Sequence, residues 1–348
     1  MTKPKRAPTL SDVAERAGVS PFTASVVLNG SRSNTRVSES TRQRILEVAA
    51  ELRYHPNAMA RGLVHRRMNT VGVLFSVMDS SAVVTNPYGS TILQGILMAA
   101  EKAGYNVTIF TETWRSAEQS AVRFRDGRTD GILVIAPVTD SDMMPGLAAL
   151  GLPLVAIAYP AESYSAPCVD VDNARGIRLA VEHLLSLGHR RIAHLTGNPN
   201  MGSVPVRREA FCQVLAEAGI PILPEYIVTC RYDGLMTRES VAHLLALPEP
   251  PTAIVAGNDA IAIEAMAAAR ERGVAVPEQL SIVGFDDTPS ATLVTPALTT
   301  VRQPLLEIGG MATRLLVAQI EGKTVPPTAH LLEPELVVRA STASNDVR

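Results

Sequence analysis

The first thirty residues of the chain predict two short helices joined by a tight turn. Four apolar residues recur at the spacing of one helical face: Leu10, Val13, Ala14 and Ala17. Thr9 precedes them as an N-cap residue, and Gly18 can take the left-handed conformation that ends a helix. Ser20 and Pro21 then suit the cap and the first position of a second helix. Small residues at the turn let the two helices cross closely, although any compact helical bundle could use such a turn.

A third helix and a short basic segment follow. We expect the helix to run from a cap at Ser38 to near Tyr54 and to close a core with Leu10, Val13, Val19 and Val27. In the next segment Pro56 sets a boundary and Asn57 can cap a helix of about two turns. So short a helix is marginal in water and should form only when it packs against another surface.

The charge of the chain is unevenly distributed. Residues 1–70 hold 12 Lys and Arg against 5 Asp and Glu, whereas the remainder holds 20 against 29, so the net charge of −2 hides a basic head on an acidic body. This asymmetry indicates a polyanionic partner for the head alone. The alternative is a solvated basic tail.

From Val71 onward, apolar runs alternate with helical stretches. The runs read as buried parallel strands at 71–75, 107–110, 131–135 and 153–157, and again at 191–195, 253–256 and 281–285. Two series of strand–helix–strand units predict two doubly wound lobes. Ligands of such sheets bind beyond the carboxyl ends of the strands, which places a cleft between the lobes.

Polar side chains follow several of these strands and are candidates to line the cleft. They are Ser76, Asp79, Thr111, Tyr159, Asn258, Asp259, Asp286 and Asp287. Many residues in such places cap helices, and we favour that interpretation for Asp259 and Asp287.

The sequence offers little support for a metal, a cofactor or catalysis. His183, His189 and His194 fall on a helix, beside a helix stop and in a strand, so they should point in different directions. No nucleophile elbow, phosphate-binding loop or zinc-protease motif is present, and the adjacent carboxylates Asp286 and Asp287 should point apart. We therefore expect no metal, no cofactor and no enzymatic activity.

Cysteine usage and the absence of long apolar runs bear on location. The three cysteines are scattered without a CxxC pair, and no apolar run approaches the ~20 residues that a membrane span requires. The first residues do not resemble a signal peptide. These features lead us to expect a cytoplasmic protein.

The order of these motifs resembles the lactose/galactose-repressor (LacI) family over nearly the whole chain. The pattern comprises Leu10 to Asn29, Val37-Ser38 with Thr41-Arg42, Pro56-Asn57 with Ala60 and Leu63, and Val337-Val338-Arg339 with Ser341-Thr342. The resemblance implies an N-terminal all-α helix-turn-helix domain at 1–56, a hinge helix and linker at 57–69, and an α/β two-lobed periplasmic-binding-protein-like domain of doubly wound parallel sheets at 70–348. It places the first lobe at about 70–169 and 300–330, and the second at about 170–299 and 331–340.

The resemblance also implies a DNA-binding transcriptional repressor. A homodimer would bind double-stranded operator DNA, and a small-molecule effector, a sugar or sugar derivative, would control it allosterically. The chain's end shows no heptad-rich extension, so a dimer is expected rather than a tetramer. The lobes should be joined by three crossings, near Val169-Asp170, Leu298-Thr299 and Leu331-Leu332, with 299–304 as a return segment into the first lobe.

The family's DNA-contacting positions fall on ten residues of this chain. Ser20, Thr23, Ser25 and Asn29 match phosphate contacts, Pro21, Phe22 and Val26 match base-reading positions, and Asn57, Ala60 and Leu63 match the hinge helix, with Leu63 as a minor-groove wedge. None of the three base-reading residues can form a bidentate hydrogen bond with a base edge. We therefore expect a T-rich operator and a larger share of shape readout. The alternative is that Phe22 and Val26 pack inside the head.

The family's effector positions fall on residues of both lobes. They are Asn86 and Tyr88 in an Asn-Pro-aromatic stretch, Arg207, Asn258 and Asp286, with Tyr159 and Tyr232 as aromatic candidates. A guanidinium, an amide and a carboxylate supply the donors and acceptors that vicinal hydroxyls need. Ala158-Tyr159 stands where the family often places an Asp, which favours a sugar derivative, a glycoside or another polar metabolite over a simple hexose.

Two other classes of protein compete with this interpretation. A sugar-binding transport component shares the two-lobed body, but it predicts an export signal and no DNA-binding head. A sugar-modifying enzyme would need a nucleophile or a set of metal ligands, which the sequence does not offer.

Overall fold

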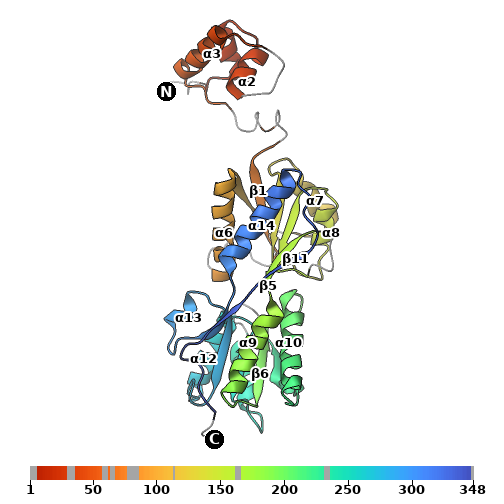
Figure 1. Ribbon diagram of the computed structural model, residues 1–348, viewed down its shortest axis with the longest axis vertical. Helices are drawn as coiled ribbons and strands as arrows, with labels where there is room; N and C mark the ends of the chain where they lie inside the picture. Colours follow the sequence, from red (N-terminus) through yellow and green to blue (C-terminus); the bar gives the residue numbers. More distant parts are fainter. Residues whose placement is uncertain are drawn as a thin grey trace. The chain divides into compact units, whose positions relative to one another are not determined.

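The computed structural model describes residues 6–29, 36–56, 62, 67–76, 86–112, 114–160, 166–230 and 236–345. The chain divides into two compact units, Met1–Thr70 with Gly127–Asp130, and Val71–Asp126 with Gly131–Arg348 (Figure 1). None of the helices in these ranges combines the length and apolar character needed to span a bilayer.

The first unit contains the three helices α1 (Leu10–Ala17), α2 (Pro21–Asn29) and α3 (Glu39–Glu51). The starts of the three helices and the end of α1 are those the sequence predicts, whereas α3 ends at Glu51, before the expected Tyr54. The Thr9 side chain accepts from the Asp12 amide while the Asp12 carboxylate accepts from the Thr9 amide at 2.7 Å, which is a capping box. Gly18 has a φ of 64° and ends α1, and the Ser38 hydroxyl accepts from the amide of Thr41 at the start of α3.

A small apolar core holds these helices together. It consists of Val13, Ala14, Ala17, Ala24, Val27, Ile45, Val48 and Ala49, with Leu10, Val19, Leu28, Val37, Leu52 and Tyr54 packed against it. The three-helix core expected from Leu10, Val13, Val19 and Val27 is thus confirmed.

The second unit contains two six-stranded sheets, one in each lobe. The first sheet has the order β11-β5-β4-β3-β1-β2, with β1 (Thr70–Phe75), β2 (Asn106–Phe110), β3 (Gly131–Ile135), β4 (Leu154–Ile157), β5 (Cys168–Val171) and β11 (Ala329–Leu332). The second has the order β12-β10-β9-β8-β6-β7, with β6 (Ile192–Thr196), β7 (Ile227–Thr229), β8 (Ala253–Ala256), β9 (Ser281–Asp286), β10 (Thr299–Arg302) and β12 (Glu335–Val337). β12 pairs antiparallel with β10, whereas β10, β9, β8, β6 and β7 pair in parallel.

Helices cover both faces of each sheet, as the doubly wound prediction requires (Figure 1). Around the first sheet lie α6 (Pro87–Ala103) and α14 (Leu305–Ile320), with α7 (Ala117–Phe124) and α8 (Met143–Ala148). Around the second lie α9 (Asn173–Ser186), α10 (Ser203–Glu217), α11 (Thr237–Leu245), α12 (Asp259–Glu271), α13 (Ser290–Leu293) and the short η2 (Pro224–Tyr226). A Cβ on Gly95 would lie 2.1 Å from the Leu306 carbonyl oxygen, so glycine permits the close crossing of α6 and α14.

Side chains alternate between the two faces of each sheet and pack into a separate apolar core on each face. On β1, Val71 and Val73 join the cluster of α6 and α14, whereas Leu74 joins Phe124 and Met143 of α7 and α8. All seven strands expected in the body are present, within one residue of the expected bounds. The short strand β7 and the crossing strands β5, β10, β11 and β12 were not predicted as strands.

The chain passes between the lobes three times, but one crossing lies later than expected. β10 pairs with β9 along its whole length, from Thr299 opposite Val283 to Arg302 opposite Asp286. Residues 299–302 therefore belong to the second sheet, and the expected crossing near Leu298-Thr299 is wrong. The crossing follows Arg302. The three residues before Arg302 are buried in β10, and Pro304 cannot continue the hydrogen bonding of a strand. The other two crossings follow β5 and β11, both of which pair within the first sheet.

Candidate DNA-facing helix and effector cleft

The two apolar candidates for base reading on helix α2 differ in their exposure to solvent. Phe22 is 61% exposed, whereas Val26 is only 8% exposed. The alternative in which both side chains pack inside the head therefore fits Val26 and not Phe22. An exposed phenyl ring on a short helix is available for apolar contact with a thymine methyl group.

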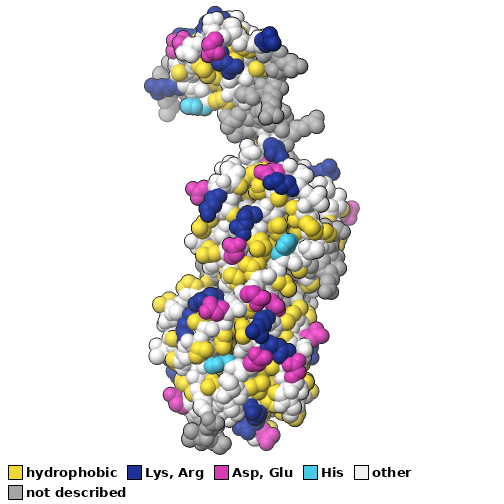
Figure 2. All heavy atoms as spheres, in the orientation of Figure 1, with side chains coloured by type: hydrophobic (Ala, Val, Ile, Leu, Met, Phe, Trp, Pro, Cys, Tyr) yellow, Lys and Arg dark blue, Asp and Glu magenta, His cyan; other side chains and the backbone are white. Residues whose placement is uncertain are grey.

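The polar candidates of α2 lie at the start and the end of the helix. The Ser20 hydroxyl accepts from the Thr23 amide at 3.1 Å, as the expected cap does, and the Asn29 amide group donates to the Ser25 hydroxyl at 2.9 Å. Figure 2 shows Lys and Arg side chains spread over the surface of the head between apolar ones. The hinge candidates Asn57, Ala60 and Leu63 lie outside the described residues.

Arg207 is the most constrained cation of the second lobe. It sits on the buried face of α10, between Val204 and Phe211, and is 5% exposed. Its Nε donates to Asn173 Oδ1 at 2.8 Å and its Nη1 to the Gly257 carbonyl at 2.6 Å. The guanidinium carbon lies 3.6 Å from the centroid of the Phe285 ring, a cation–π contact.

These contacts fix the guanidinium without using all of its donors. A guanidinium has five N–H groups, and the two bonds to Asn173 and Gly257 occupy one on Nε and one on Nη1. The two hydrogens of Nη2 have no hydrogen-bond partner among the described residues. Arg207 is thus held rigidly with donors left for a ligand.

Asp286 ends β9 close to this arginine. It is 6% exposed, and Gln303 Nε2 donates to its Oδ1 at 2.6 Å. Burial and, to a smaller extent, the neighbouring Asp259 raise the pKa of Asp286 to about 8, while Arg207 opposes the shift. Its φ of 125° is unusual for a residue with a side chain, and such strain concentrates at functional sites.

Asp259 and Asp287 hold loops together and do not cap helices, so the cap interpretation of these two residues is wrong. Asn258 is the N-cap of α12, its Oδ1 accepting from the Ile261 amide at 2.9 Å. The carboxylate of Asp259, one position further, instead accepts from Thr288 and Thr300: from the Thr288 amide at 2.7 Å and the Thr300 hydroxyl at 2.6 Å.

Asp287 lies next to Asp286 but faces different partners. Its carboxylate pairs with Arg302 at 2.7 Å and with Arg339 at 2.5 Å. Its φ of 56° is also in the left-handed region. The two adjacent carboxylates therefore point apart, as the sequence suggests.

The partly buried carboxyl group of Asp170 reaches Arg207 through an amide. Asn173 Nδ2 donates to Asp170 Oδ2 at 2.9 Å, while Asn173 Oδ1 accepts from Arg207. Burial raises the pKa of Asp170 to about 6. The sequence treats Asp170 only as part of a crossing and does not single out Asn173. An acidic residue inside the apolar run 168–171 was the signal that could have drawn attention to both.

The candidates from the first lobe have mainly structural partners. Asn86 caps α6, its Oδ1 accepting from the amides of Tyr88 at 3.0 Å and Gly89 at 3.4 Å, and Tyr88 packs half-buried against the core. Tyr159 is 4% exposed and belongs to the apolar cluster of α7 and α8. Tyr232 lies outside the described residues.

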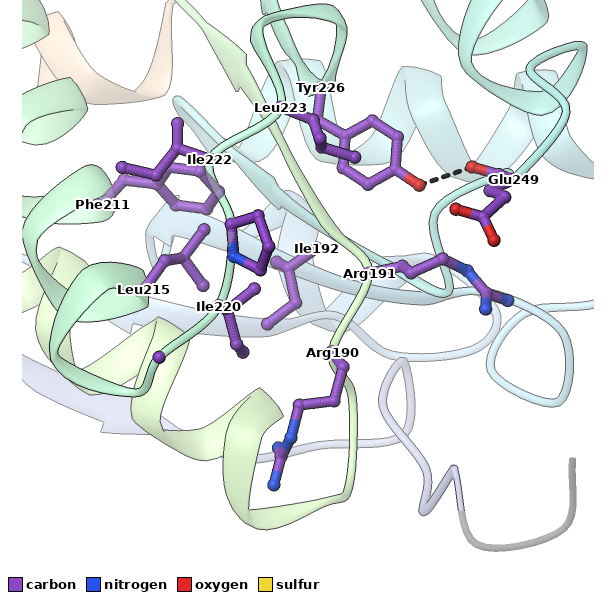
Figure 3. A pocket seen from close by; sticks show the side chains of 12 residues that line it. Arg190, Arg191, Ile192, Phe211, Leu215, Ile220, Ile222, Leu223, Tyr226 and Glu249 are labelled. Atoms are coloured by element: carbon purple, nitrogen blue, oxygen red, sulfur yellow. Dashed lines mark hydrogen bonds between the residues drawn. The ribbon is translucent and has the colours of Figure 1, made fainter.

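A hollow of about 430 Å³ lies at the opposite end of the second sheet from these groups (Figure 3). Its wall includes Ile192, at the start of β6, and Leu215 of α10. Arg190 at its edge donates to backbone carbonyls of Leu185 and His189, and Arg191 donates to that of Pro250. The hollow therefore lies at the amino end of β6, whereas Arg207 and Asp286 lie toward the carboxyl ends, where ligands of such sheets bind.

The three histidines considered as metal ligands have separate partners. His183 contacts the Thr342 hydroxyl, His189 contacts those of Thr252 and Ser281, and His194 contacts the Val255 carbonyl. Across the described part of the chain, no three His, Cys, Asp or Glu side chains are grouped in a way that could hold a metal ion.

Comparison with known proteins agrees with this architecture. Residues 9–57 match the family model described as bacterial regulatory proteins, lacI family, and residues 181–342 match a periplasmic binding protein-like domain. The HTH-type transcriptional regulator DegA of Bacillus subtilis is 33% identical over 340 residues, covering 96% of this chain and 98% of its own. Catabolite control protein A of Priestia megaterium is 32% identical, covering 96% and 99%.

Solved structures agree over the same length. A Lac repressor dimer bound to operator and the anti-inducer ONPF superposes with a TM-score of 0.84 at 28% identity, covering 97% of this chain and all of the other. The transcriptional regulator CelR in complex with cellobiose gives a TM-score of 0.73 at 30% identity, covering 96% and 99%. The expected fold is confirmed, and the chain belongs to the lacI family of bacterial regulatory proteins.

Proposed function

We propose that this chain is a transcriptional repressor whose affinity for operator DNA is set by a sugar or sugar derivative bound between its two lobes. The observation that carries the proposal is the state of Arg207, which is buried and held by three contacts yet retains N–H groups without a protein partner. A protein does not gain stability from burying a charged group in this way, so a ligand is the better explanation of its donors.

The chemistry around Arg207 suits a molecule with neighbouring oxygens. Arg207 supplies donors, and Asp286, which interacts with it electrostatically, keeps its Oδ2 without a hydrogen-bond partner among the described residues. A guanidinium donor beside a carboxyl group, which donates when protonated and accepts when ionised, fits a pair of hydroxyls. We assign Arg207, Asp286 and Asn258 to the effector, with Asn86, Tyr88 and Tyr232 as further candidates; the burial of Tyr159 in a core cluster makes it the weakest.

The names of relatives support a sugar-like effector. The chain resembles the ribose operon repressor of Haemophilus influenzae, at 31% identity over 339 residues, and the CelR–cellobiose complex. These relatives are regulators, and we assign this chain no catalytic activity and a place in the cytoplasm.

The head supplies the other half of the function. We assign Ser20, Thr23, Ser25 and Asn29 to phosphate contacts, Phe22 with Pro21 to base contact, and Asn57, Ala60 and Leu63 to the minor groove. Val26 is nearly buried and contributes least to that surface. Two copies of the chain would bind the two halves of an operator.

A change in the relative rotation of the lobes when the effector binds would link the two sites. Three crossings join the lobes, so rotation about them moves the first lobe relative to the second. Strand β1 of the first lobe directly follows the linker from the head in the chain. By linkage, effector and operator then change each other's affinity by the same factor.

Two measurements test the proposal. A thermal-shift screen of the full chain against pentoses, hexoses, disaccharides and glycosides should find a stabilising ligand, because saturation at 100 times Kd adds about 2.7 kcal/mol. Electrophoretic mobility shifts should show salt-dependent binding to DNA upstream of the chain's own gene. Failure of DNA binding would remove the regulatory function; binding of DNA with no response to any sugar would remove the proposed effector class.

A further inference from the structure

Two loops of the body, one from each lobe, bond to each other. Residues 138–140 follow β3 in the first lobe, and residues 198–202 precede α10 in the second. Val138 and Met201 form an isolated antiparallel bridge. Next to it, the Thr139 amide donates to the Asn200 carbonyl at 2.8 Å, and the Thr139 hydroxyl donates to the same oxygen at 3.1 Å.

A side-chain pair and a close backbone contact extend this junction. Asn200 Nδ2 donates to a carboxylate oxygen of Asp140. A Cβ placed on Gly202 would lie 2.5 Å from Cδ of Pro160, which comes shortly after β4 in the first lobe. The backbone of the second lobe therefore rests directly on a proline of the first, and only glycine allows that approach.

Each side of the junction is anchored within its own lobe. On the first lobe, the Val138 amide donates to Ser76 Oγ at the end of β1 at 3.3 Å. On the second, Asn198 holds the turn, its Oδ1 accepting from the Asn200 amide at 3.1 Å and its carbonyl from the Met201 amide at 3.0 Å. Helix α10 begins directly afterwards, one turn before Arg207.

We propose that residues 138–140 and 198–202 form a latch that holds the two lobes closed before any effector binds, so that the effector enters when the latch opens. Its hydrogen bonds lie at a rim where Thr139 and Asp140 are exposed, and hydrogen bonds that compete with water are individually weak. The latch therefore opens reversibly. It lowers apparent effector affinity by the fraction of molecules that are closed and keeps the unliganded body in one conformation.

The distance between the lobes, measured without DNA or effector, tests this directly. Spin labels on cysteines introduced at the exposed positions Glu118 of α7 and Glu209 of α10 report it by double electron–electron resonance. The background carries Cys212→Ser, because Cys168 and Cys230 are buried. The parent should show one narrow short-distance population.

Variants of the latch supply the comparison. Thr139→Pro removes the backbone N–H that bonds to Asn200, and we expect the short-distance population to fall at least threefold in favour of longer distances. Thr139→Val is the matched control, since it keeps that N–H and loses only the hydroxyl, and it should stay close to the parent. Gly202→Ala attacks the latch at a different contact, with Pro160, and should also shift the population outward.

The result can overturn the proposal in two ways. A parent that already shows the longer distances without ligand has no closed latch. Alternatively, Thr139→Pro and Gly202→Ala that both fold, by circular dichroism, and both keep the parent distribution show that these contacts do not hold the lobes. Neither reading depends on whether the chain binds an operator or a sugar, so failure of the proposed function leaves this test unchanged.

Discussion

The two lobes share a strand order, although the sixth strand is parallel in the first sheet and antiparallel in the second, and they differ in chemistry. If the strands of each lobe are counted in chain order, with β11 and β12 as the sixth of their lobes, both sheets have the order 6-5-4-3-1-2. The carboxyl ends of the second sheet carry or face buried Arg207, Asp259 and Asp286. At the corresponding place after its fourth strand, the first lobe has Ala158-Tyr159, both nearly buried.

Positive φ values occur at these edges in both lobes. Ala136 and Ala158, after β3 and β4, have left-handed φ values of 49° and 57°, and Asp286, at the end of β9, has 125°, which lies outside that region. A positive φ at this edge therefore does not require a charged side chain, but the more strained value belongs to Asp286. The comparison of the lobes indicates that the apolar strands determine the path of the chain. The residues that follow the strands determine which lobe binds the polar groups of a ligand. On this view the second lobe supplies the charges and the first an apolar wall.

The largest loss should come from removing the cation of the second lobe. At pH 8.5, above the raised pKa values of Asp170 and Asp286, Arg207→Met removes the opposite charge that both carboxylates share, and we expect a loss of about 3 kcal/mol in unfolding free energy with loss of effector binding. Urea unfolding and thermal shift with the best ligand of the sugar screen measure the two effects. Arg208→Met, at the exposed neighbouring position of α10, is the matched control and should change neither. Equal behaviour of the two variants would contradict the charge asymmetry of the lobes.

The next effect concerns the pH dependence of stability. Because the folded state raises the pKa of Asp286 to about 8, this group favours folding at low pH, and that contribution is lost as the pH rises from about 4 to about 8. Asp286→Asn should remove this loss and be more stable than the parent at pH 8, by up to about 5 kcal/mol. Unfolding midpoints of the ligand-free protein between pH 5 and 8.5 measure it.

Asp142, an exposed acid of the first lobe, should contribute a pH dependence of stability with the opposite sign. The Ala117 amide and the Trp114 indole donate to Asp142 and hold its pKa below the ordinary value. That contribution is present at neutral pH and is lost as the pH falls through the lowered pKa, so Asp142→Asn should affect the acid side only. If Asp286→Asn and Asp142→Asn change the same side of the profile, the assignment of the raised pKa to Asp286 is wrong.

The sequence predicts the framework of this molecule better than its contacts. Caps at Thr9 and Ser38, the stop at Gly18 and the strands of the body depend on local patterns, and the structure has them where expected. The crossing strand β10 was misplaced because its Thr-Thr-Val-Arg sequence is equally compatible with either sheet. Only pairing with β9 decides between them.

The partners of polar residues were the least predictable part. Asp259 follows a strand and opens a helix, which is the pattern of a cap, yet its carboxylate bonds to Thr288 and Thr300, 29 and 41 residues away. Asn173 has no local signal at all, and its role depends on α9, α10 and β5 meeting in space. Such contacts follow from the packing of the whole lobe and not from any window of the sequence.

A smaller effect is expected from Asn173, which lies between Asp170 and Arg207. Asn173→Ala leaves the guanidinium held by Gly257 and Phe285 only, so we expect effector affinity to fall about tenfold, or about 1.4 kcal/mol. Calorimetric titration with the best ligand of the screen measures it. Asn173→Ser, which keeps a short hydrogen-bonding group at the start of α9, should recover part of the affinity if the position of Arg207 is what matters. Failure of both variants to alter affinity would show that Arg207 is positioned without Asn173.

The smallest effect, in the head, extends the contrast between charged and apolar recognition to the operator. Phe22 is exposed, so Phe22→Ala should leave thermal stability unchanged and weaken operator binding by about 1 kcal/mol, through lost contact with thymine methyl groups. Val26→Ala, at a nearly buried position of the same helix, should instead lower stability. Binding-site selection with parent protein should return T-rich half-sites, and replacing those thymines by uracil should weaken the parent as much as Phe22→Ala does. If uracil substitution leaves parent affinity intact, or if selection returns invariant guanines opposite α2, the head reads its operator by polar contacts and the apolar interpretation of Phe22 fails.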